Sequence, residues 1–282
     1  MSDPNGRVPV LMVVHAHPDD ESSSTGGTLA RYSALGYRTI LVTCTDGRQG
    51  DATGGAKPGQ TGHDPHEVAQ RRADELDAAA AALGITEVVK LRYPDSGVDD
   101  DCAEEAFSTR PVSPLVHQLV RLMRIYRPDV VITYPPNGLS GHPDHIRTHD
   151  IVVAAHADVV AAGDSPALYY IALSRSRVKA FQANARAAFG DDGWAPPDDM
   201  AVDDAMVTTV IDVGSHLSAK LAGLAAHSSQ ADAAMLLHMF SARRDLDARG
   251  GDVEEYIRVY PPTAGAAAEI ERDLFGLVRL HG

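Results

Sequence analysis

The chain of 282 residues is 44% hydrophobic, carries a formal net charge of −14 and contains two cysteines. This length and apolar content suffice for a full hydrophobic core, so we expect a soluble globular protein. The negative charge, with basic residues spread along the chain, disfavours nucleic acid and membrane surfaces as partners and favours small neutral or cationic substrates. Two cysteines support neither a disulfide framework nor a thiolate zinc site, so a metal would have to be bound by His and carboxylate groups.

The N-terminal segment MSDPNGR lacks an apolar core of signal-peptide length, and no stretch approaches the roughly 20 apolar residues of a membrane span. We therefore expect a cytoplasmic protein. The sequence makes no prediction of the oligomeric state.

Predicted strands and helices alternate through the first half of the chain. Gly36 and Gly84 each end a helical pattern, Ser24 or Thr25 can cap the first helix, and Ser113-Pro114 starts a later one. The predicted strands cover residues 8–14, 39–45, 88–91 and 130–134, and the predicted helices cover about 25–35, 65–83 and 113–126.

This alternation indicates an α/β fold, namely a Rossmann-like, mostly parallel sheet with helices on both faces and an active site at the carboxyl ends of the strands. The first loop has His-Pro-Asp-Asp in place of GxGxxG, and no GxxxxGK[ST] motif occurs. Neither NAD nor a nucleotide phosphate is therefore indicated.

The alternating pattern weakens after residue 165. We expect strands at 167–172 and 206–212, a loop at 190–204, and helices at 178–189, 216–227 and 264–280. Since no repeat or clear linker occurs, we interpret residues 1–282 as a single domain. Residues 1–165 would form the core that carries the metal site, and residues 166–282 a C-terminal elaboration of it.

Two polar motifs follow predicted strands directly. HAHPDDE (residues 15–21) comes after the strand at 8–14, and GHPDH (residues 141–145) follows the strand at 130–134. In a doubly wound sheet these strands are neighbours at the topological switch point, so the two loops can meet around one ion. Either motif alone could be a helix-entry turn, because Pro and Asp favour that position. Their joint placement favours a metal site.

The expected ligands are His17 and Asp20 from the first motif and His145 from the second. Three protein ligands with an open fourth position are typical of catalytic zinc, which lowers the pKa of a bound water toward about 7. We expect one Zn²⁺ per chain, with Fe²⁺ or another divalent ion as the alternative.

The remaining polar residues of the motifs suit supporting roles. Asp19 is free to accept a proton from that water, and His142 is placed to protonate a leaving group or to donate a hydrogen bond to a developing oxyanion. Asp144 could orient one of the imidazoles, and His15 fits inner support better than ligation.

The two motifs resemble those of the PIG-L/LmbE family of zinc-dependent N-deacetylases, over about residues 8–160. The segment AHSSQ at 226–230 is similar to a late family element. The likeness is strongest to the actinobacterial branch, which includes the GlcNAc-inositol deacetylase of mycothiol biosynthesis, an amidase of mycothiol S-conjugates and antibiotic-tailoring sugar deacetylases. The resemblance implies the same zinc ligands and the same roles for Asp19 and His142.

The resemblance also implies two substrate contacts. Arg72 matches a family Arg that helps to hold substrate, and Asp95 matches an Asp that contacts sugar hydroxyls. Each has a structural alternative: Arg72 could pair with Glu75 at i, i+3, and Asp-Ser-Gly is an ordinary turn sequence.

The chain departs from the family pattern at the rim of the expected site. Leu139-Ser140 stand where the mycothiol enzymes have a Tyr, so the Ser140 hydroxyl, with Asn137 nearby, is a candidate substrate contact. Residues 23–26 lack the Lys of the amidase branch, which argues against that activity. The Gly-rich segment 46–65 is expected to form a loop over the site.

The sequence thus predicts a metal-dependent hydrolase that removes an N-acetyl or N-acyl group from an amino sugar, a GlcNAc-containing small molecule such as GlcNAc-inositol. The S-conjugate amidase and antibiotic-tailoring activities are alternatives within the family. A non-catalytic sugar-binding protein is a more distant alternative, because structural zinc sites usually close the fourth position with protein. A two-metal phosphoesterase would need more bridging carboxylates.

Overall fold

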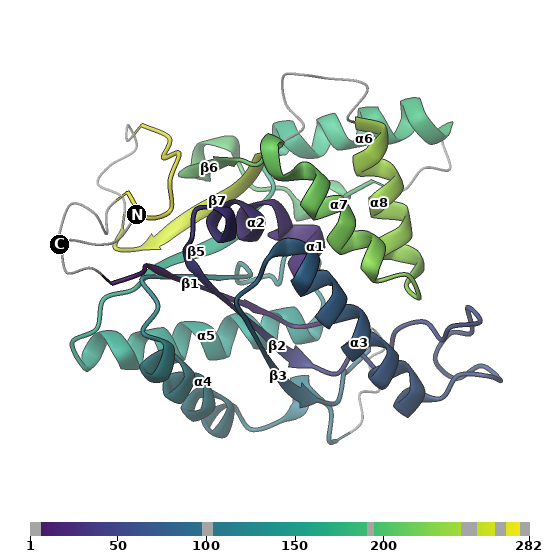
Figure 1. The fold of residues 1–282 in the computed structure, drawn as a ribbon, viewed down its shortest axis with the longest axis horizontal. Helices are drawn as coiled ribbons and strands as arrows, with labels where there is room; N and C mark the ends of the chain where they lie inside the picture. Colours follow the sequence, from purple (N-terminus) through teal and green to yellow (C-terminus); the bar gives the residue numbers. More distant parts are fainter. Residues whose placement is uncertain (1–6, 98–103, 191–194, 244–252, 263–268, 277–282) are drawn as a thin grey trace.

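The computed structural model describes residues 7–97, 104–190, 195–243, 253–262 and 269–276, whose strands form one mixed sheet in the order β3-β2-β1-β4-β5-β7-β6 (Figure 1). Strands β1 to β5 are parallel, and β7 is antiparallel to both β5 and β6. The strands are β1 Val10–His15, β2 Arg38–Thr45, β3 Glu87–Tyr93, β4 Val130–Thr133, β5 Ala167–Ala172, β6 Thr209–Asp212 and β7 Val253–Tyr260.

Helices cover both faces of this sheet, as the alternation predicts. Helices α4 and α5 lie on one face, and α2, α3 and α7 lie on the other (Figure 1). The helices are α1 Asp20–Ser24, α2 Gly26–Ala34, α3 Pro65–Leu83, α4 Val112–Tyr126, α5 Pro143–Ala161, α6 Arg175–Phe189, α7 Leu217–Ala226 and α8 Ala231–Arg243.

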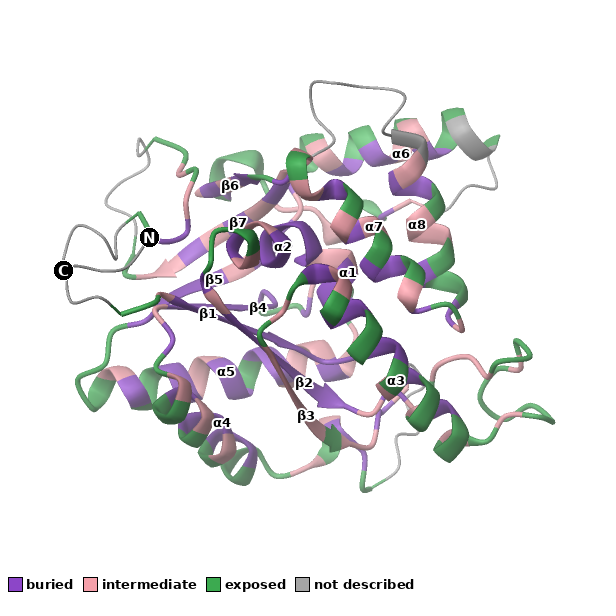
Figure 2. Ribbon diagram, in the orientation of Figure 1, coloured by how far each residue is buried: buried purple, intermediate pink, exposed green. Residues whose placement is uncertain are grey.

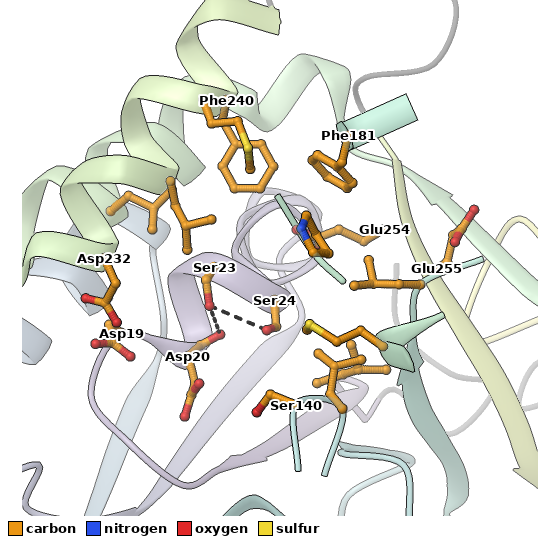
Figure 3. A pocket seen from close by; sticks show the side chains of 18 of the residues that line it. Asp19, Asp20, Ser23, Ser24, Ser140, Phe181, Asp232, Phe240, Glu254 and Glu255 are labelled. Carbon is orange, nitrogen blue, oxygen red and sulfur yellow. Dashed lines mark hydrogen bonds between the residues drawn. The ribbon is translucent and has the colours of Figure 1, made fainter. Parts of the chain in front are cut away.

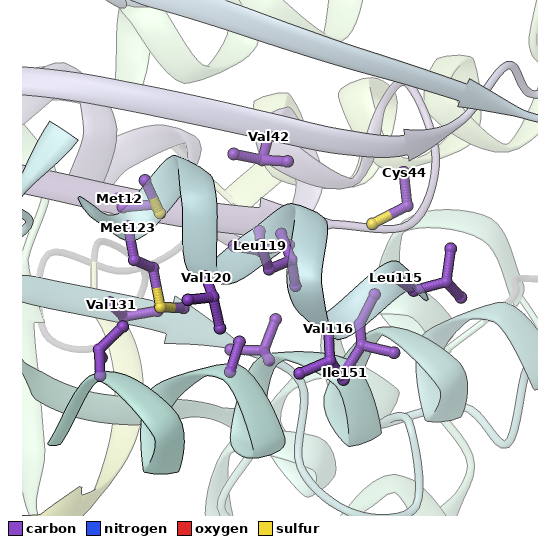
Figure 4. Packing of buried hydrophobic residues seen from close by; sticks show 14 of the residues in the cluster. Met12, Val42, Cys44, Leu115, Val116, Leu119, Val120, Met123, Val131 and Ile151 are labelled. Atoms are coloured by element: carbon purple, nitrogen blue, oxygen red, sulfur yellow. The ribbon is translucent and has the colours of Figure 1, made fainter. Parts of the chain in front are cut away.

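The central strand β1 is buried along its whole length (Figure 2). Met12 and Val14 pack in the cluster under α4 and α5, where Leu119 and Ile151 are also buried (Figure 4). Leu11, on the opposite face, packs in the cluster that includes α2. Burial on both sides explains why β1 reads as a continuous apolar run rather than an alternating one.

The predicted arrangement of the first four strands is confirmed. β1 lies between β2 and β4 in parallel register, so the two polar motifs emerge at the same edge of the sheet. Gly84 ends α3 in the left-handed conformation, with φ 69°, as the sequence predicts. Cys44 is buried in β2, whereas the other cysteine, at position 102, lies outside the described residues.

Two helix starts differ from the prediction. The helix expected from about residue 25 is preceded by the short helix α1, so the first motif leads directly into a helix rather than into a loop. Helix α4 begins at Val112 with Pro111 at its N-cap, so the predicted cap at Ser113 is wrong.

The second half of the chain contains most of the errors. Helix α8 and strand β7 were not predicted, and β6 begins at Thr209 because residues 204–206 form a 3₁₀ turn. The helix predicted at 264–280 is wrong in its described part, because residues 269–276 are not helical. The rest of that range, 264–268 and 277–280, lies outside the described residues. In the described part of the chain, no helix is long and apolar enough to cross a membrane.

Candidate metal centre

Parallel pairing of β1 with β4 brings the two polar motifs together. His17 and Asp20 follow β1 directly, with Asp20 at the first position of α1. His145 projects from the first turn of α5, which begins at Pro143 with His142 as its N-cap. Residues 128 positions apart thus meet, with His17 Nδ1 3.2 Å from His145 Nε2.

The three predicted ligands form a small triangle of donor atoms. Asp20 Oδ2 lies 3.4 Å from His17 Nδ1 and 3.5 Å from His145 Nε2. Donors bound tetrahedrally to zinc at about 2.0–2.1 Å are about 3.3–3.4 Å apart, so the triangle matches the edges of such a site. The residues present therefore fit a zinc ion, or another divalent ion that accepts imidazole and carboxylate ligands.

The other nitrogen of each imidazole has an acceptor that fixes its proton. His17 Nε2 lies 3.2 Å from Asp144 Oδ2 and 3.5 Å from Asp95 Oδ1, and His145 Nδ1 lies 3.0 Å from the carbonyl oxygen of Gly138. With their protons held there, both rings direct a lone pair toward the Asp20 carboxylate. Two lone pairs and a carboxylate at this spacing repel one another unless a cation lies between them.

Asp20 is held in place by buried groups that the sequence did not single out. Its Oδ2 accepts hydrogen bonds from the Tyr134 hydroxyl at 2.7 Å and from the backbone N–H of His17 at 2.8 Å. Burial alone would raise the pKa of Asp20, but positive charge beside it holds that pKa well below its usual range. Protonated His145 and His17 supply this charge, and a cation bound between the three groups would supply it with both rings neutral. His15 Nδ1 lies 3.1 Å from the Tyr134 hydroxyl and the side chain is fully buried, while its supporting role stays a prediction.

Asp19 occupies a constrained backbone conformation beside the triangle. Its φ is 109°, which is rare for a residue with a side chain and is a feature of functional sites. Arg72 binds its Oδ2 at 2.6 Å, and Glu21 Oε2 accepts its backbone N–H at 2.9 Å. Burial raises the pKa of Asp19 to about 7, although the Arg72 guanidinium opposes the shift.

Glu21 is itself anchored by a residue from the distant AHSSQ segment. Its Oε1 lies 2.7 Å from His227 Nε2, and neither side chain is exposed. The chain His227–Glu21–Asp19 therefore links the C-terminal part of the protein to the backbone of the candidate base. Sequence reasoning matched the AHSSQ segment to the family but assigned no role to His227.

His142 lies next to the triangle, its ring centroid 4.5 Å from that of His17. Its Nδ1 accepts the backbone N–H of Asp144 at 3.1 Å, so a neutral ring carries its proton on Nε2. Burial and the neighbouring imidazoles lower the pKa of His142 to about 4. A neutral His142 with a proton on Nε2 suits hydrogen bonding to an oxyanion better than it suits proton donation to a leaving group.

Asp144 lies where the sequence predicts a supporting carboxylate. It is fully buried and accepts the backbone N–H and the hydroxyl of Ser96 as well as His17 Nε2. His17, Asp95 and Asp144 could also be considered as a second cation site. We favour the first triangle, because the Asp144 carboxylate already accepts these hydrogen bonds and neither Asp95 nor Asp144 lines the cavity in front of the triangle.

The four predicted substrate contacts differ in their access to that cavity, which has a volume of about 270 Å³. Ser140 lines it together with Asp19, Asp20 and His145, whereas Asn137, Arg72 and Asp95 do not. The Asn137 Oδ1 accepts the backbone N–H of Leu139, so this side chain holds the turn.

Arg72 and Asp95 are bound to other parts of the site. Arg72 donates to Asp19 and to the carbonyls of Gly47 and Pro18, while the alternative partner Glu75 pairs with Arg71 instead, at 3.0 Å. Asp95 accepts the backbone N–H of Gly97 and lies against His17. Both side chains are buried and neither lines the cavity. Their assignment as substrate contacts stays a prediction.

The loop at 46–65 does not cover the cavity. None of its residues, all of which are described, lines the cavity wall, and in Figure 1 the loop extends away from the sheet beyond α3. Only its first part approaches the site, where the Gly47 carbonyl accepts from Arg72 and the Asp51 N–H donates to Gln230. The expectation of a loop over the site is therefore wrong.

The chain belongs to the PIG-L family, whose profile, described as GlcNAc-PI de-N-acetylase, matches residues 12–156. A 1D-myo-inositol 2-acetamido-2-deoxy-alpha-D-glucopyranoside deacetylase from Actinosynnema mirum is 37% identical over 95% of this chain and 96% of its own length. The family resemblance expected from the two motifs is therefore confirmed, and it extends well beyond residue 160.

Solved structures share the fold at lower sequence identity. The N,N'-diacetylchitobiose deacetylase from Pyrococcus horikoshii is 19% identical, with a TM-score of 0.59 over 89% of this chain and 83% of its own. The 4-carboxy-2-hydroxymuconate hydratase from Pseudomonas putida has the same TM-score at 18% identity, over 92% of this chain and 99% of its own. Because these two proteins are named for different reactions, the fold alone does not specify the chemistry.

Proposed function

We propose that the protein is a metal-dependent deacetylase that hydrolyses the N-acetyl group of an amino sugar, with GlcNAc-inositol as the first substrate to test. The observation that carries this proposal is the triangle of His17, Asp20 and His145, of which Asp20 and His145 line a cavity together with Asp19. The activity printed for the Actinosynnema mirum relative supports the choice of GlcNAc-inositol.

A zinc ion bound by these three residues would polarise the acetyl oxygen and lower the pKa of the attacking water. Asp19, held by Arg72 and Glu21, accepts a proton from that water and passes it to the departing amine nitrogen. A nearby cation favours the ionised carboxylate, so Asp19 is a competent base at neutral pH even though burial raises its pKa. His142 donates a hydrogen bond from Nε2 to the oxyanion of the tetrahedral intermediate.

The products are acetate and a free amine. The cytoplasmic location expected from the sequence stays a prediction. The S-conjugate amidase remains disfavoured, because residues 23–26 carry no Lys.

The test is to incubate the purified, zinc-loaded protein with GlcNAc-inositol, N-acetylglucosamine and a mycothiol S-conjugate, and to follow free amine and acetate by mass spectrometry. We expect acetate release from GlcNAc-inositol, abolished by a chelator and restored by zinc. Cleavage of the S-conjugate alone would favour the amidase, and no cleavage of any amide would favour the non-catalytic binding protein.

A further inference from the structure

The cavity in front of the metal ligands becomes apolar away from them. Asp20, Ser140 and the serines of α1 lie at one end, and the rings of Phe181 and Phe240 lie at the other (Figure 3). The apolar part is formed by Leu173, directly after β5, and by residues of helices α6, α7 and α8, namely Phe181, Leu224, Leu236, Met239 and Phe240.

Three charged side chains on this wall, Lys220, Glu254 and Glu255, are bound to the protein itself. Lys220 Nζ donates to Glu254 Oε1 at 2.6 Å and lies 4.8 Å from the centre of the Phe240 ring. The Glu255 carboxylate accepts the backbone N–H and the hydroxyl of Ser174. Since these groups have partners within the chain, a ligand with many hydroxyl groups would lose hydration here without full compensation.

An N-acyl amino sugar carries hydroxyl groups around its ring, and its acyl chain is its apolar part. We propose that the cavity binds this acyl chain, and that the enzyme removes medium-length linear N-acyl groups, such as octanoyl, in preference to acetyl. The inference rests on the proposed function, because the amide must be cleaved at His17, Asp20 and His145 for the chain to enter the cavity beside them. It departs from the acetyl group that the relatives' printed names give, and keeps the amino sugar.

The experiment uses the zinc-loaded full-length enzyme with N-acetyl-, N-butanoyl- and N-octanoyl-glucosaminyl-inositol, and measures kcat/KM from the free amine. Each methylene buried in the transition state can raise kcat/KM by up to about fourfold. We therefore expect the octanoyl substrate to exceed the acetyl substrate by about tenfold or more.

Three outcomes would overturn parts of this account, and they are distinguishable. Equal or lower kcat/KM for octanoyl, with acetyl still cleaved, contradicts the acyl-chain proposal and leaves the proposed function intact. Cleavage of no substrate contradicts the proposed function itself. If octyl N-acetylglucosaminide is preferred over the methyl glycoside while octanoyl brings no gain, the cavity binds an aglycone and our assignment of its occupant is wrong.

A cavity-filling variant provides a second test. Leu236→Trp on α8 should lower the octanoyl-to-acetyl ratio of kcat/KM by about tenfold, because the larger side chain occupies the space of the acyl chain. If Leu236→Trp does not fold, Met200→Trp on another part of the wall takes its place. It should also lower the octanoyl-to-acetyl ratio of kcat/KM. Ile125→Trp on α4, where Ile125 is 63% exposed, is the matched control and should keep the wild-type ratio. An unchanged ratio in a folded cavity variant would contradict the proposal.

Discussion

The chemistry of the site depends on where two imidazole protons lie. Asp144 accepts from His17 Nε2, and the Gly138 carbonyl accepts from His145 Nδ1, so different nitrogens of the two rings face the Asp20 carboxylate. His142 Nδ1 accepts the backbone N–H of Asp144, so the proton of the neutral ring lies on Nε2. Three histidines from two loops thus differ in role because each has a different hydrogen-bond partner.

Separate variants should distinguish the metal ligand from the base. His145→Ala should lose bound zinc and activity together, because only two ligands remain. Asp19→Ala should keep zinc, while kcat falls by about 10²- to 10⁴-fold through loss of the general base. Metal analysis and kcat of each purified variant are the measurements, and full activity in Asp19→Ala would show that another group is the base.

The buried pair of His227 and Glu21 should affect the rate through the position of Asp19. His227→Ala should lower kcat by about tenfold or more, with zinc content and KM little changed, because Glu21 loses the partner that orients its bond to the Asp19 backbone. His227→Gln, whose amide can donate near the position of Nε2, should restore part of the rate. A variant that loses stability but retains kcat would assign the pair a purely structural role.

At the scale of the element, the turn between β4 and α5 sets the position of His145. Gly138 has φ 66°, and a Cβ there would lie 2.9 Å from the His145 Cβ and 2.9 Å from the backbone nitrogen of Ile146. Gly138→Ala should therefore displace His145 and weaken zinc affinity by about 10- to 100-fold, measured by competition with a chelator.

Gly163 offers a matched control for that substitution. It also has a positive φ, of 100°, but a Cβ there meets nothing within 4 Å. Gly163→Ala should thus have only the backbone strain of the left-handed conformation and keep the wild-type zinc affinity. Equal affinities for the two variants would contradict the steric argument.

The elements that carry the site could be predicted from the sequence because their signals are local. The apolar run of β1 and the Pro at the start of α5 each specify one element, and parallel pairing then brings the two motifs together. Tyr134 was not assigned to the site, because its contact with Asp20 depends on tertiary packing rather than on any motif. The Arg72–Asp19 pair was missed for the same reason, since the local partner Glu75 was an equally good choice from sequence.

At the scale of the whole molecule, the part after residue 165 completes the sheet and the cavity. It contributes β5, β7 and β6 to the sheet and most of the apolar wall. Of its strands only β7 was missed, because Glu254 and Arg258 lie on its buried face and its sequence therefore lacks the apolar-polar alternation of a half-buried strand. The interpretation as a single domain stays a prediction, supported by a sheet that both parts share.

The buried carboxylate of Glu254 joins these parts and should make stability depend on pH. Glu254 accepts from Lys220 on α7 and from the backbone N–H groups of Gly27 and Thr28 at the start of α2. Although burial alone would raise it, Lys220 and Thr28 lower the pKa of Glu254 from 4.5. The stabilisation is therefore fully present above pH 4.5 and is lost as the pH falls below that value.

Glu254→Gln should lower the free energy of unfolding by about 3–5 kcal/mol at pH 7, because it leaves the Lys220 ammonium buried without its counter-charge. The difference from wild type should shrink below pH 4.5 in urea denaturation. Glu67→Gln is the control, since Glu67 is exposed in the first turn of α3, where loss of its charge costs about 0.3–1 kcal/mol. A constant difference between wild type and Glu254→Gln across this pH range would contradict the linkage.

The most direct test of the central claim is a crystal of the zinc-loaded protein measured with anomalous scattering at the zinc absorption edge. We expect one anomalous peak per chain, about 2.0–2.2 Å from His17 Nδ1, His145 Nε2 and an Asp20 oxygen, with Asp19 beside it on the cavity wall. A peak between His17 Nε2, Asp95 and Asp144, or no peak at either position, would contradict the account.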